Sequence, residues 1–194
     1  MPKPLPQISL QLHIELDEVR PAVWRRILVP TAVSLDRLAD MLLAAMGWTN
    51  SHLHCFSIGD VRYGMQFDDY PDDELDEKGV TVLRALQDVK RFEFEYDFGD
   101  RWIHTVACED RIPSPVGLKY AVCIDGANAC PPEDCGGPDG FERFVEALAD
   151  PAHPEHEMYV DWNDGAVFDR QGFDLVTVNA ALQKVRLRGN SERY

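Results

Sequence analysis

The sequence predicts an α+β domain, because strand-like segments come first along the chain and helical segments come last. Residues 8–16 alternate apolar and polar side chains, which is typical of a half-buried strand. The apolar spacing changes to that of a helix after Ser34, and helical spacing returns beyond residue 140. We therefore expect an antiparallel, curled sheet, of which the β-grasp is one example, with one packed helix and a mainly helical C-terminal part.

The first predicted helix follows two strands. Residues 23–29 form the second strand, and Ser34 is expected to cap the helix by accepting a hydrogen bond from a backbone N–H. Gly47 can end the helix because glycine adopts the left-handed conformation without strain. The face turned to the sheet is expected to carry Leu35, Leu38 and Leu42.

The next strands are expected as two hairpins, residues 53–58 with 61–64 and residues 92–96 with 102–108. Gly59 suits the first position of a two-residue type II′ turn. A short helix over residues 82–86 precedes the second hairpin.

An acidic run separates the hairpins, and we interpret it as a mobile surface loop. It lacks the alternate acids around a central glycine that a calcium loop requires. Its members are Asp68, Asp69, Asp72, Asp73, Glu74, Asp76 and Glu77.

The character of the chain changes near residue 112. Proline and glycine become frequent up to Pro138, which predicts a long irregular loop. Helical spacing then indicates one helix through Phe141 and Leu148 and another through Phe173 and Ala180. We treat residues 1–194 as one domain, in which 1–111 form the sheet with its helix and 112–194 form the irregular loop and the helices.

The net charge of −15 makes nucleic acid an unlikely partner, because an acidic surface repels phosphate. We interpret the scattered basic residues as solvated charges; they are Arg20, Arg25, Arg26, Lys184, Arg186 and Arg188. The longest apolar run is too short to span a bilayer, and the N-terminus lacks an apolar signal region. We expect a cytoplasmic protein that does not contact a membrane.

Five cysteines without a secretion signal predict free thiols in a reducing compartment. Zinc needs four ligands, and no clean second pair accompanies Cys130 and Cys135, so we predict no metal or cofactor. Structural zinc remains an alternative, held by Cys123, Cys130 and Cys135 with His104 or Glu133.

Two histidines, His52 and His54, are separated by one residue at the start of a predicted strand and would share one of its faces. Such a pair binds a metal only if a third ligand converges on it. The simpler interpretation is that both are ordinary residues at a strand start.

Two segments concentrate chemically specialised residues: residues 95–104 (EYDFGDRWIH) and 130–137 (CPPEDCGG). We expect them to lie against each other and form one functional surface, because binding residues tend to sit on loops held by a rigid sheet. The alternative is that each loop only satisfies its own backbone. The candidate ligand-binding residues are Tyr96, Asp97, Asp100, Trp102, His104, Glu133 and Asp134.

An acid–base set is the enzymatic alternative. A carboxylate beside an imidazole orients the ring and raises its pKa. Aspartates are also favoured in turns, because their side chains bond nearby backbone N–H groups, so a structural role stays open. The candidate catalytic residues are Asp97, Asp100, His104 and Glu133.

A series of short motifs resembles the root-inducing-plasmid open-reading-frame-three-like family over about residues 7–186. These are PAVWR at 21–25, AMGW at 45–48, HLH at 52–54, YDFGDRWIH at 96–104, CPPEDCGG at 130–137, FD at 168 and at 173, and Asn179. The resemblance implies a bacterial or archaeal α+β domain of undetermined activity, linked to plasmids or mobile elements. The family's occasional label as a resolvase has no support here, because a serine recombinase needs a nucleophilic serine among clustered arginines.

We predict a non-enzymatic binding or interaction protein whose partner is an unknown small molecule or protein. A hydrolase-like acid–base enzyme is the alternative. Convergence of the candidate side chains would discriminate between these two classes.

Overall fold

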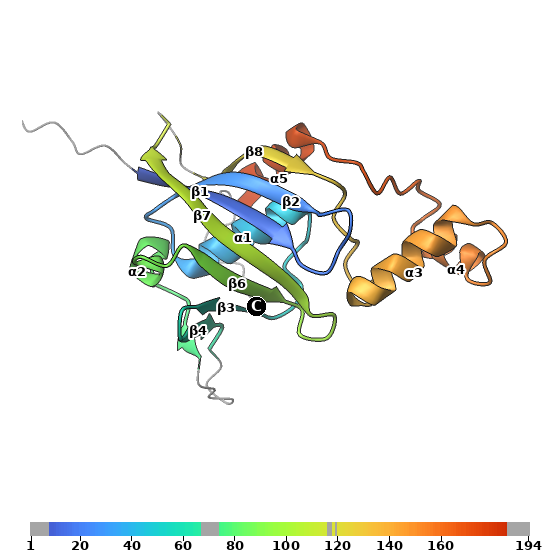
Figure 1. The fold of residues 1–194 in the computed structure, drawn as a ribbon, viewed down its shortest axis with the longest axis horizontal. Coiled ribbons are helices and arrows are strands. Elements are labelled where there is room, and N and C mark those ends of the chain that lie inside the picture. The colour runs from blue at the N-terminus through green and yellow to red at the C-terminus, as the bar shows by residue number, and fades with distance from the viewer. Residues whose placement is uncertain (1–7, 67–73, 116–117, 119, 186–194) are drawn as a thin grey trace, which may run out of the picture.

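A computed structural model of the chain describes residues 8–66, 74–115, 118 and 120–185 (Figure 1). Its strands form an eight-stranded sheet in the order β5-β4-β3-β6-β7-β1-β2-β8. The strands are β1 (Ile8–Leu16), β2 (Trp24–Pro30), β3 (His54–Ile58), β4 (Val61–Gly64), β5 (Leu75–Asp76), β6 (Arg91–Tyr96), β7 (Trp102–Pro113) and β8 (Val122–Ala127). The helices are α1 (Leu35–Met46), α2 (Val82–Leu86), α3 (Gly137–Ala149), α4 (His156–Trp162) and α5 (Leu175–Val185).

The predicted α+β class is confirmed, but the sheet is mixed and not purely antiparallel. Strand β5 runs parallel to β4, whereas every other neighbouring pair is antiparallel. Parallel neighbouring strands need a longer connection than a hairpin turn. The chain between Gly64 and Leu75 is long enough for β5 to run in the same direction as β4. Both predicted hairpins, β3–β4 and β6–β7, are present.

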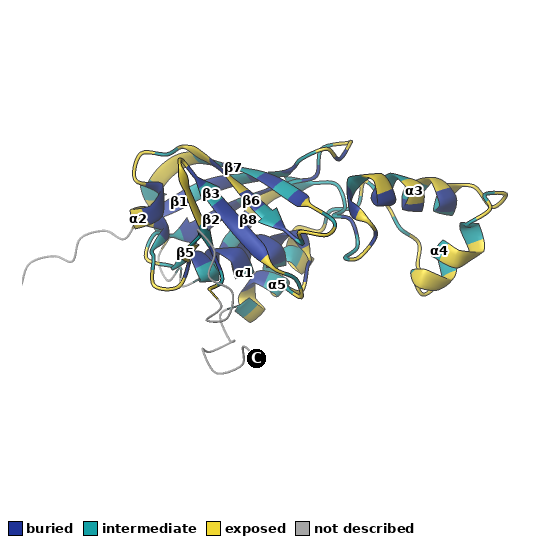
Figure 2. Cartoon of the chain, turned by 90° about the horizontal axis from the view of Figure 1, so that it is seen from below, coloured by how far each residue is buried: buried dark blue, intermediate teal, exposed yellow. Residues whose placement is uncertain are grey.

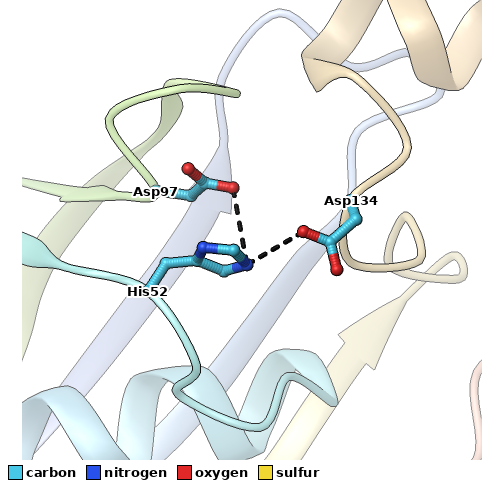
Figure 3. A group of neighbouring side chains, drawn as sticks. All are labelled: His52, Asp97 and Asp134. Carbon is cyan, nitrogen blue, oxygen red and sulfur yellow. Dashed lines mark ion pairs between the residues drawn. The ribbon is translucent and has the colours of Figure 1, made fainter.

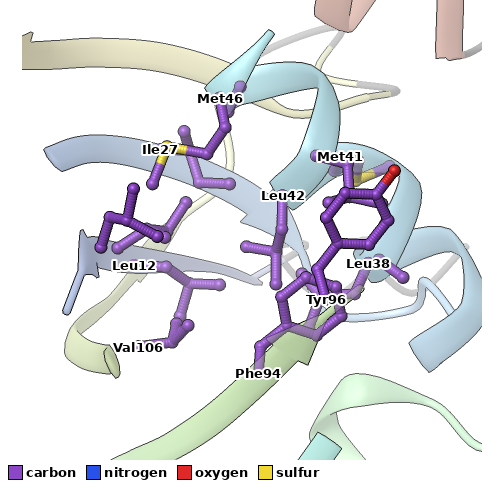
Figure 4. Packing of buried hydrophobic residues seen from close by; sticks show 14 of the residues in the cluster. Leu12, Ile27, Leu38, Met41, Leu42, Met46, Phe94, Tyr96 and Val106 are labelled. Atoms are coloured by element: carbon purple, nitrogen blue, oxygen red, sulfur yellow. The ribbon is translucent and has the colours of Figure 1, made fainter. Parts of the chain in front are cut away.

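Helix α1 packs its apolar face on the inner side of the sheet, as predicted (Figure 4). Leu38 and Leu42 are fully buried there beside Phe94 of β6 and Leu12 of β1. The alternation in β1 determines which side chains meet the helix, because every second residue points to the same face. Truncating one of these leucines to alanine would cost about 2–5 kcal/mol of stability.

The two ends of α1 follow different rules. Gly47 adopts the expected left-handed conformation with φ 101°, and its N–H donates to the carbonyl of Leu43 at 2.9 Å. The prediction that the Ser34 side chain accepts a capping hydrogen bond is wrong. The Ser34 hydroxyl donates to the carboxylate of Asp36 and accepts no bond from the helix backbone.

The described residues after position 111 contain strand structure that we did not expect. Strand β7 continues to Pro113, and β8 adds an edge strand where an irregular loop was predicted. Strand β8 has few buried side chains, so its sequence carries only a weak strand pattern. The side chain of Asn179 in α5 bonds the backbone N–H and C=O of Cys123 at 3.0 and 2.9 Å, and so covers part of the exposed edge.

The C-terminal helices divide into two groups. Helix α5 lies along α1 and β8, whereas α3 and α4 extend beyond one end of the sheet (Figures 1 and 2). Helix α3 covers the predicted Phe141–Leu148 segment, α5 begins at Leu175, and α4 was not anticipated. In the described part of the chain, no helix has both the length and the apolar composition that crossing a membrane requires.

The acidic run contains one residue that contradicts the surface-loop interpretation. Glu77 is fully buried, and its Oε2 lies 2.9 Å from Nε2 of the equally buried His54. Glu74 forms an ion pair with Arg62 at 2.8 Å. The members of the run at positions 68, 69, 72 and 73 lie outside the described residues.

Candidate functional site

Three chain segments meet at the end of the sheet where α3 begins: residues 48–54, the turn 97–101 and the loop 130–137. We call this junction the seam. The turn and the loop are in direct contact, because the backbone N–H of Gly136 donates to Oδ2 of Asp100 at 3.0 Å. The expected adjacency of these two loops is therefore present in the structure.

The 48–54 segment is bonded to both other segments of the seam. The indole N–H of Trp48 donates to the carbonyl of Pro131 at 2.8 Å. The backbone N–H of Asp97 donates to the carbonyl of Leu53 at 2.9 Å. Each pair of segments is thus connected by at least one hydrogen bond, which fixes their relative positions.

Glycine is required at one point of the seam. Gly137 has φ 70°, and a Cβ atom there would stand 2.5 Å from the carbonyl oxygen of Asp100. Any larger residue would separate the loop from the turn. Asp97 and Asp134 also have positive φ, 55° and 61°, a conformation that aspartate tolerates better than most residues.

The carboxylate of Glu133 is the centre of a hydrogen-bond network within the seam. It accepts bonds from the N–H and hydroxyl of Thr49 at 3.0 and 2.7 Å. It also accepts from the hydroxyl of Ser51 at 3.2 Å and from the hydroxyl of Tyr96 at 2.5 Å. Glu133 thus attaches the 130–137 loop to the 48–54 segment and to the end of β6.

This network changes the acidity of both partners in the Tyr96–Glu133 bond. Burial, with the neighbouring Glu133 carboxylate adding to it, raises the pKa of Tyr96 to about 12. Burial alone would raise the pKa of Glu133, but the hydrogen bonds from Tyr96 and Thr49 outweigh it, so that pKa lies below its ordinary value. The pair therefore holds a neutral phenol and a charged carboxylate at neutral pH.

A second group in the seam brings His52 between two carboxylates (Figure 3). Nε2 of His52 lies 3.0 Å from Oδ1 of Asp134 and 3.7 Å from Oδ2 of Asp97. The three ligand atoms lie within 4.8 Å of one another. His52 was predicted only as half of a His52–His54 pair, and Asp97 and Asp134 only as ligand-binding candidates, so the sequence did not reveal this combination.

The predicted His52–His54 pair does not converge, because β3 begins only at His54. His54 is fully buried with Glu77, whereas His52 precedes the strand and lies in the seam with its side chain 31% exposed. Asp97 is far from His52 along the chain, so the sequence does not indicate that they meet. The pairing of β3 with β6 brings them together.

The proposed acid–base set is not assembled. His104 is fully buried in the core, where its Nδ1 lies 3.1 Å from the carbonyl of Phe94 and its ring stands edge-on to Trp48. Burial lowers the pKa of His104 to about 4. Trp102 is likewise a core residue packed on Trp48. These two candidates point inward because alternate residues of β7 face the core.

The remaining candidates at the seam, Asp97, Asp100, Glu133 and Asp134, have different partners. Oδ1 of Asp97 accepts from the N–H of Gly99 at 3.0 Å and thus stabilises its own turn. The Asp100 and Glu133 carboxylates bond the neighbouring segments as described above. Within the described residues, the Asp134 carboxylate makes no hydrogen bond, and its side chain is 67% exposed.

The three cysteines considered for zinc do not form a ligand group within the described residues. Burial raises the pKa of Cys135 to about 12, and burial also raises the pKa of Cys123 and of Cys130. All five cysteines are free. His104 and Glu133, the suggested fourth ligands, are bonded elsewhere.

Arg25 is not a solvated charge, whereas Arg26 forms partly exposed ion pairs at the surface. Arg25 is only 3% exposed and donates to the carbonyls of Ala45, Trp24 and Ala127. Arg26 pairs with Glu109 at 2.7 Å and with Asp125 at 3.1 Å. Arg186 and Arg188 lie outside the described residues.

Comparisons with known proteins agree with the motif pattern. The family model described as plasmid pRiA4b ORF-3-like protein matches residues 9–177. The chain is 41% identical over 175 residues to the uncharacterized protein y4hQ of Sinorhizobium fredii (strain NBRC 101917 / NGR234), covering 89% of this chain and 90% of that protein. It also resembles the crystal structure of the protein of unknown function MM3350 from Methanosarcina mazei Go1, with 31% identity, a TM-score of 0.78, and coverage of 88% and 97% of the two chains.

Proposed function

We propose that this chain, which belongs to the plasmid pRiA4b ORF-3-like family, is a non-enzymatic binding domain whose recognition surface is the seam. The observation that supports this most strongly is that some seam carboxylates bond the segments to one another and others do not. Glu133 and Asp100 hold the three segments together, whereas Asp134 and Oδ2 of Asp97 face the ring of His52 and can turn toward a ligand.

The surroundings of these groups suit recognition. Leu53 and Phe98, the chain neighbours of His52 and Asp97, are each 44% exposed. A polar centre with apolar neighbours is the usual composition of a ligand site. The rigid hydrogen-bonded frame beneath it reduces the entropy that binding would otherwise cost.

The enzymatic alternative has less support. It requires Asp97, Asp100, His104 and Glu133 within hydrogen-bond reach of one reacting atom. His104 is buried against Phe94, and Glu133 is engaged by four donors, so neither is available for proton transfer to a surface substrate. The charge of −15 argues against a nucleic-acid partner for the same surface.

A thermal-shift screen tests the binding role. Wild-type protein and the Leu53→Ser/Phe98→Ser double variant are compared against a panel of cationic, zwitterionic and anionic metabolites. We expect at least one compound to raise the Tm of the wild type and to leave that of the double variant unchanged. If a compound stabilises both proteins equally, the recognition surface does not include Leu53 and Phe98. Hydrolysis of a chromogenic ester or phosphate that His52→Ala abolishes would make the protein an enzyme.

A further inference from the structure

We infer that His52, Asp97 and Asp134 bind a divalent transition-metal ion, an inference that rests on the proposed binding role of the seam and gives that site a chemical centre. Ligand atoms of one ion stand about 3.0–3.4 Å apart when each bond is about 2.1 Å long. Nε2 of His52 lies 3.0 and 3.7 Å from the two nearest carboxylate oxygens, so small side-chain rotations would bring all three atoms to one ion.

The ring nitrogen of His52 provides the first supporting observation. Its Nε2 atom is buried and makes no hydrogen bond with the described residues, although a carboxylate oxygen stands 3.0 Å away. A buried polar nitrogen normally has a partner. A metal ion between the imidazole and the carboxylates would satisfy the nitrogen and both acids together.

The second observation is the free coordination capacity of the two carboxylates. Asp97 uses Oδ1 to accept from Gly99, which fixes the turn and leaves Oδ2 turned toward His52. Asp134 has no hydrogen bond within the described part of the chain and is held in place by the loop that begins at the Pro131 contact with Trp48. The three ligands come from three different segments, so an ion would also bridge the seam (Figure 3).

The ligand set indicates which ion is bound. Imidazole suits Zn²⁺ and other transition ions, and carboxylates suit Mn²⁺, whereas Ca²⁺ and Mg²⁺ prefer oxygen ligands alone. The group that could hold an ion offers one ring nitrogen and two carboxylate oxygens, and no cysteine belongs to it among the described residues. Three protein ligands leave at least one position on the ion open, as in zinc sites that bind water or a substrate group. An ion at this place would therefore present an open coordination position to an oxygen-bearing ligand.

Calorimetric titration of the metal-free full-length chain with Zn²⁺ and with Mn²⁺ tests this inference. We expect one equivalent to bind, and Asp134→Asn and His52→Ala each to weaken binding at least about tenfold. The matched controls are Asp139→Asn, an exposed acid five positions further along the chain, and His13→Ala, a histidine stacked on Trp24 away from the seam. Both controls should bind as the wild type does.

Cobalt binding distinguishes this site from the cysteines. Co²⁺ held by nitrogen and oxygen should lack the intense thiolate charge-transfer absorption. Stoichiometric binding that survives both ligand variants, or that shows the thiolate band, would overturn the inference. So would the absence of detectable binding at about 1 mM metal, a concentration that half-fills a site with a Kd of about 1 mM. Asp134 is exposed, so Asp134→Asn keeps the test valid even if His52→Ala folds poorly.

The metal site and the recognition surface can fail independently. The Leu53→Ser/Phe98→Ser variant should keep Zn²⁺ affinity while losing the ligand found in the thermal-shift screen. If Asp134→Asn loses Zn²⁺ binding but still binds the metabolite, the binding role stands and the ion takes no part in it.

Discussion

His52 and His54 stand two residues apart, and each has a carboxylate within 3.0 Å, but their surroundings differ completely. His54 and Glu77 are both fully buried in the core, and their remaining polar atoms have no partner among the described residues. His52 is partly exposed and lies between two acids from different segments. The comparison teaches that burial, more than the identity of the pair, separates a structural histidine from one that can receive a ligand.

The buried member should dominate stability. Glu77→Ala leaves His54 without its partner in the core, and breaking a buried pair costs about 3–5 kcal/mol. Urea unfolding followed by tryptophan fluorescence measures this loss, with the exposed Glu93→Ala as control. A loss below about 1 kcal/mol, the usual effect of a mutation without a special mechanism, would contradict the structural assignment. The His54→Leu/Glu77→Leu variant should be more stable than the sum of the single losses predicts.

The second buried histidine should make stability depend on pH. The pKa of His104 is about 4 in the folded protein, lowered by burial from the ordinary value of 6.5, so the unfolded chain binds more protons between these values. The free energy of unfolding is thus unaffected by this group above pH 6.5. It should fall by about 3 kcal/mol as the pH drops toward 4.

Unfolding titrations across that pH window measure the effect of His104. His104→Phe should flatten the slope, whereas the control His13→Phe should preserve it. An identical slope in wild type and His104→Phe would assign the pH dependence to other groups.

Within the seam, adjacent acids should behave differently. Glu133→Ala removes the acceptor of four hydrogen bonds and should cost about 2 kcal/mol, the scale of bonds to a charged group. Asp134→Ala should stay within about 0.5 kcal/mol, because its exposed carboxylate makes no such bond among the described residues. Thermal unfolding of the two variants measures both losses of stability. Equal losses would show that Glu133 and Asp134 do not differ in their structural role.

An equally small effect on the metal-free protein is expected for His52→Ala, below about 0.5 kcal/mol. The difference should appear only with metal. At Zn²⁺ concentrations about 100 times Kd, the wild type should gain about 2.7 kcal/mol and the variant should not. Thermal-shift curves with and without Zn²⁺ measure this, and equal gains in both proteins would exclude His52 as a ligand.

Local patterns determined much of the scaffold. The period-two alternation of β1 and the helical spacing of α1 are set by which side chains must avoid water, and both elements appear where expected. Gly47 ends α1 because its conformation is a local property of the backbone. The weakly patterned β8 and the short α4 were missed, because few of their side chains are buried and the rest of the fold supports them.

The candidate site was only partly visible in the sequence. The composition of residues 97–101 and 130–137 indicated specialised loops, and their special conformations are local requirements of aspartate and glycine. Which side chains meet was decided by tertiary structure. Pairing of β3 with β6 brings His52 beside Asp97, and the glycine contact with Asp100 brings Asp134 to the same point. Alternation along β7 turned His104 into the core. Sequence thus determined the residues available for chemistry, whereas strand register and loop packing, which depend on contacts distant along the chain, determined which of them face one another.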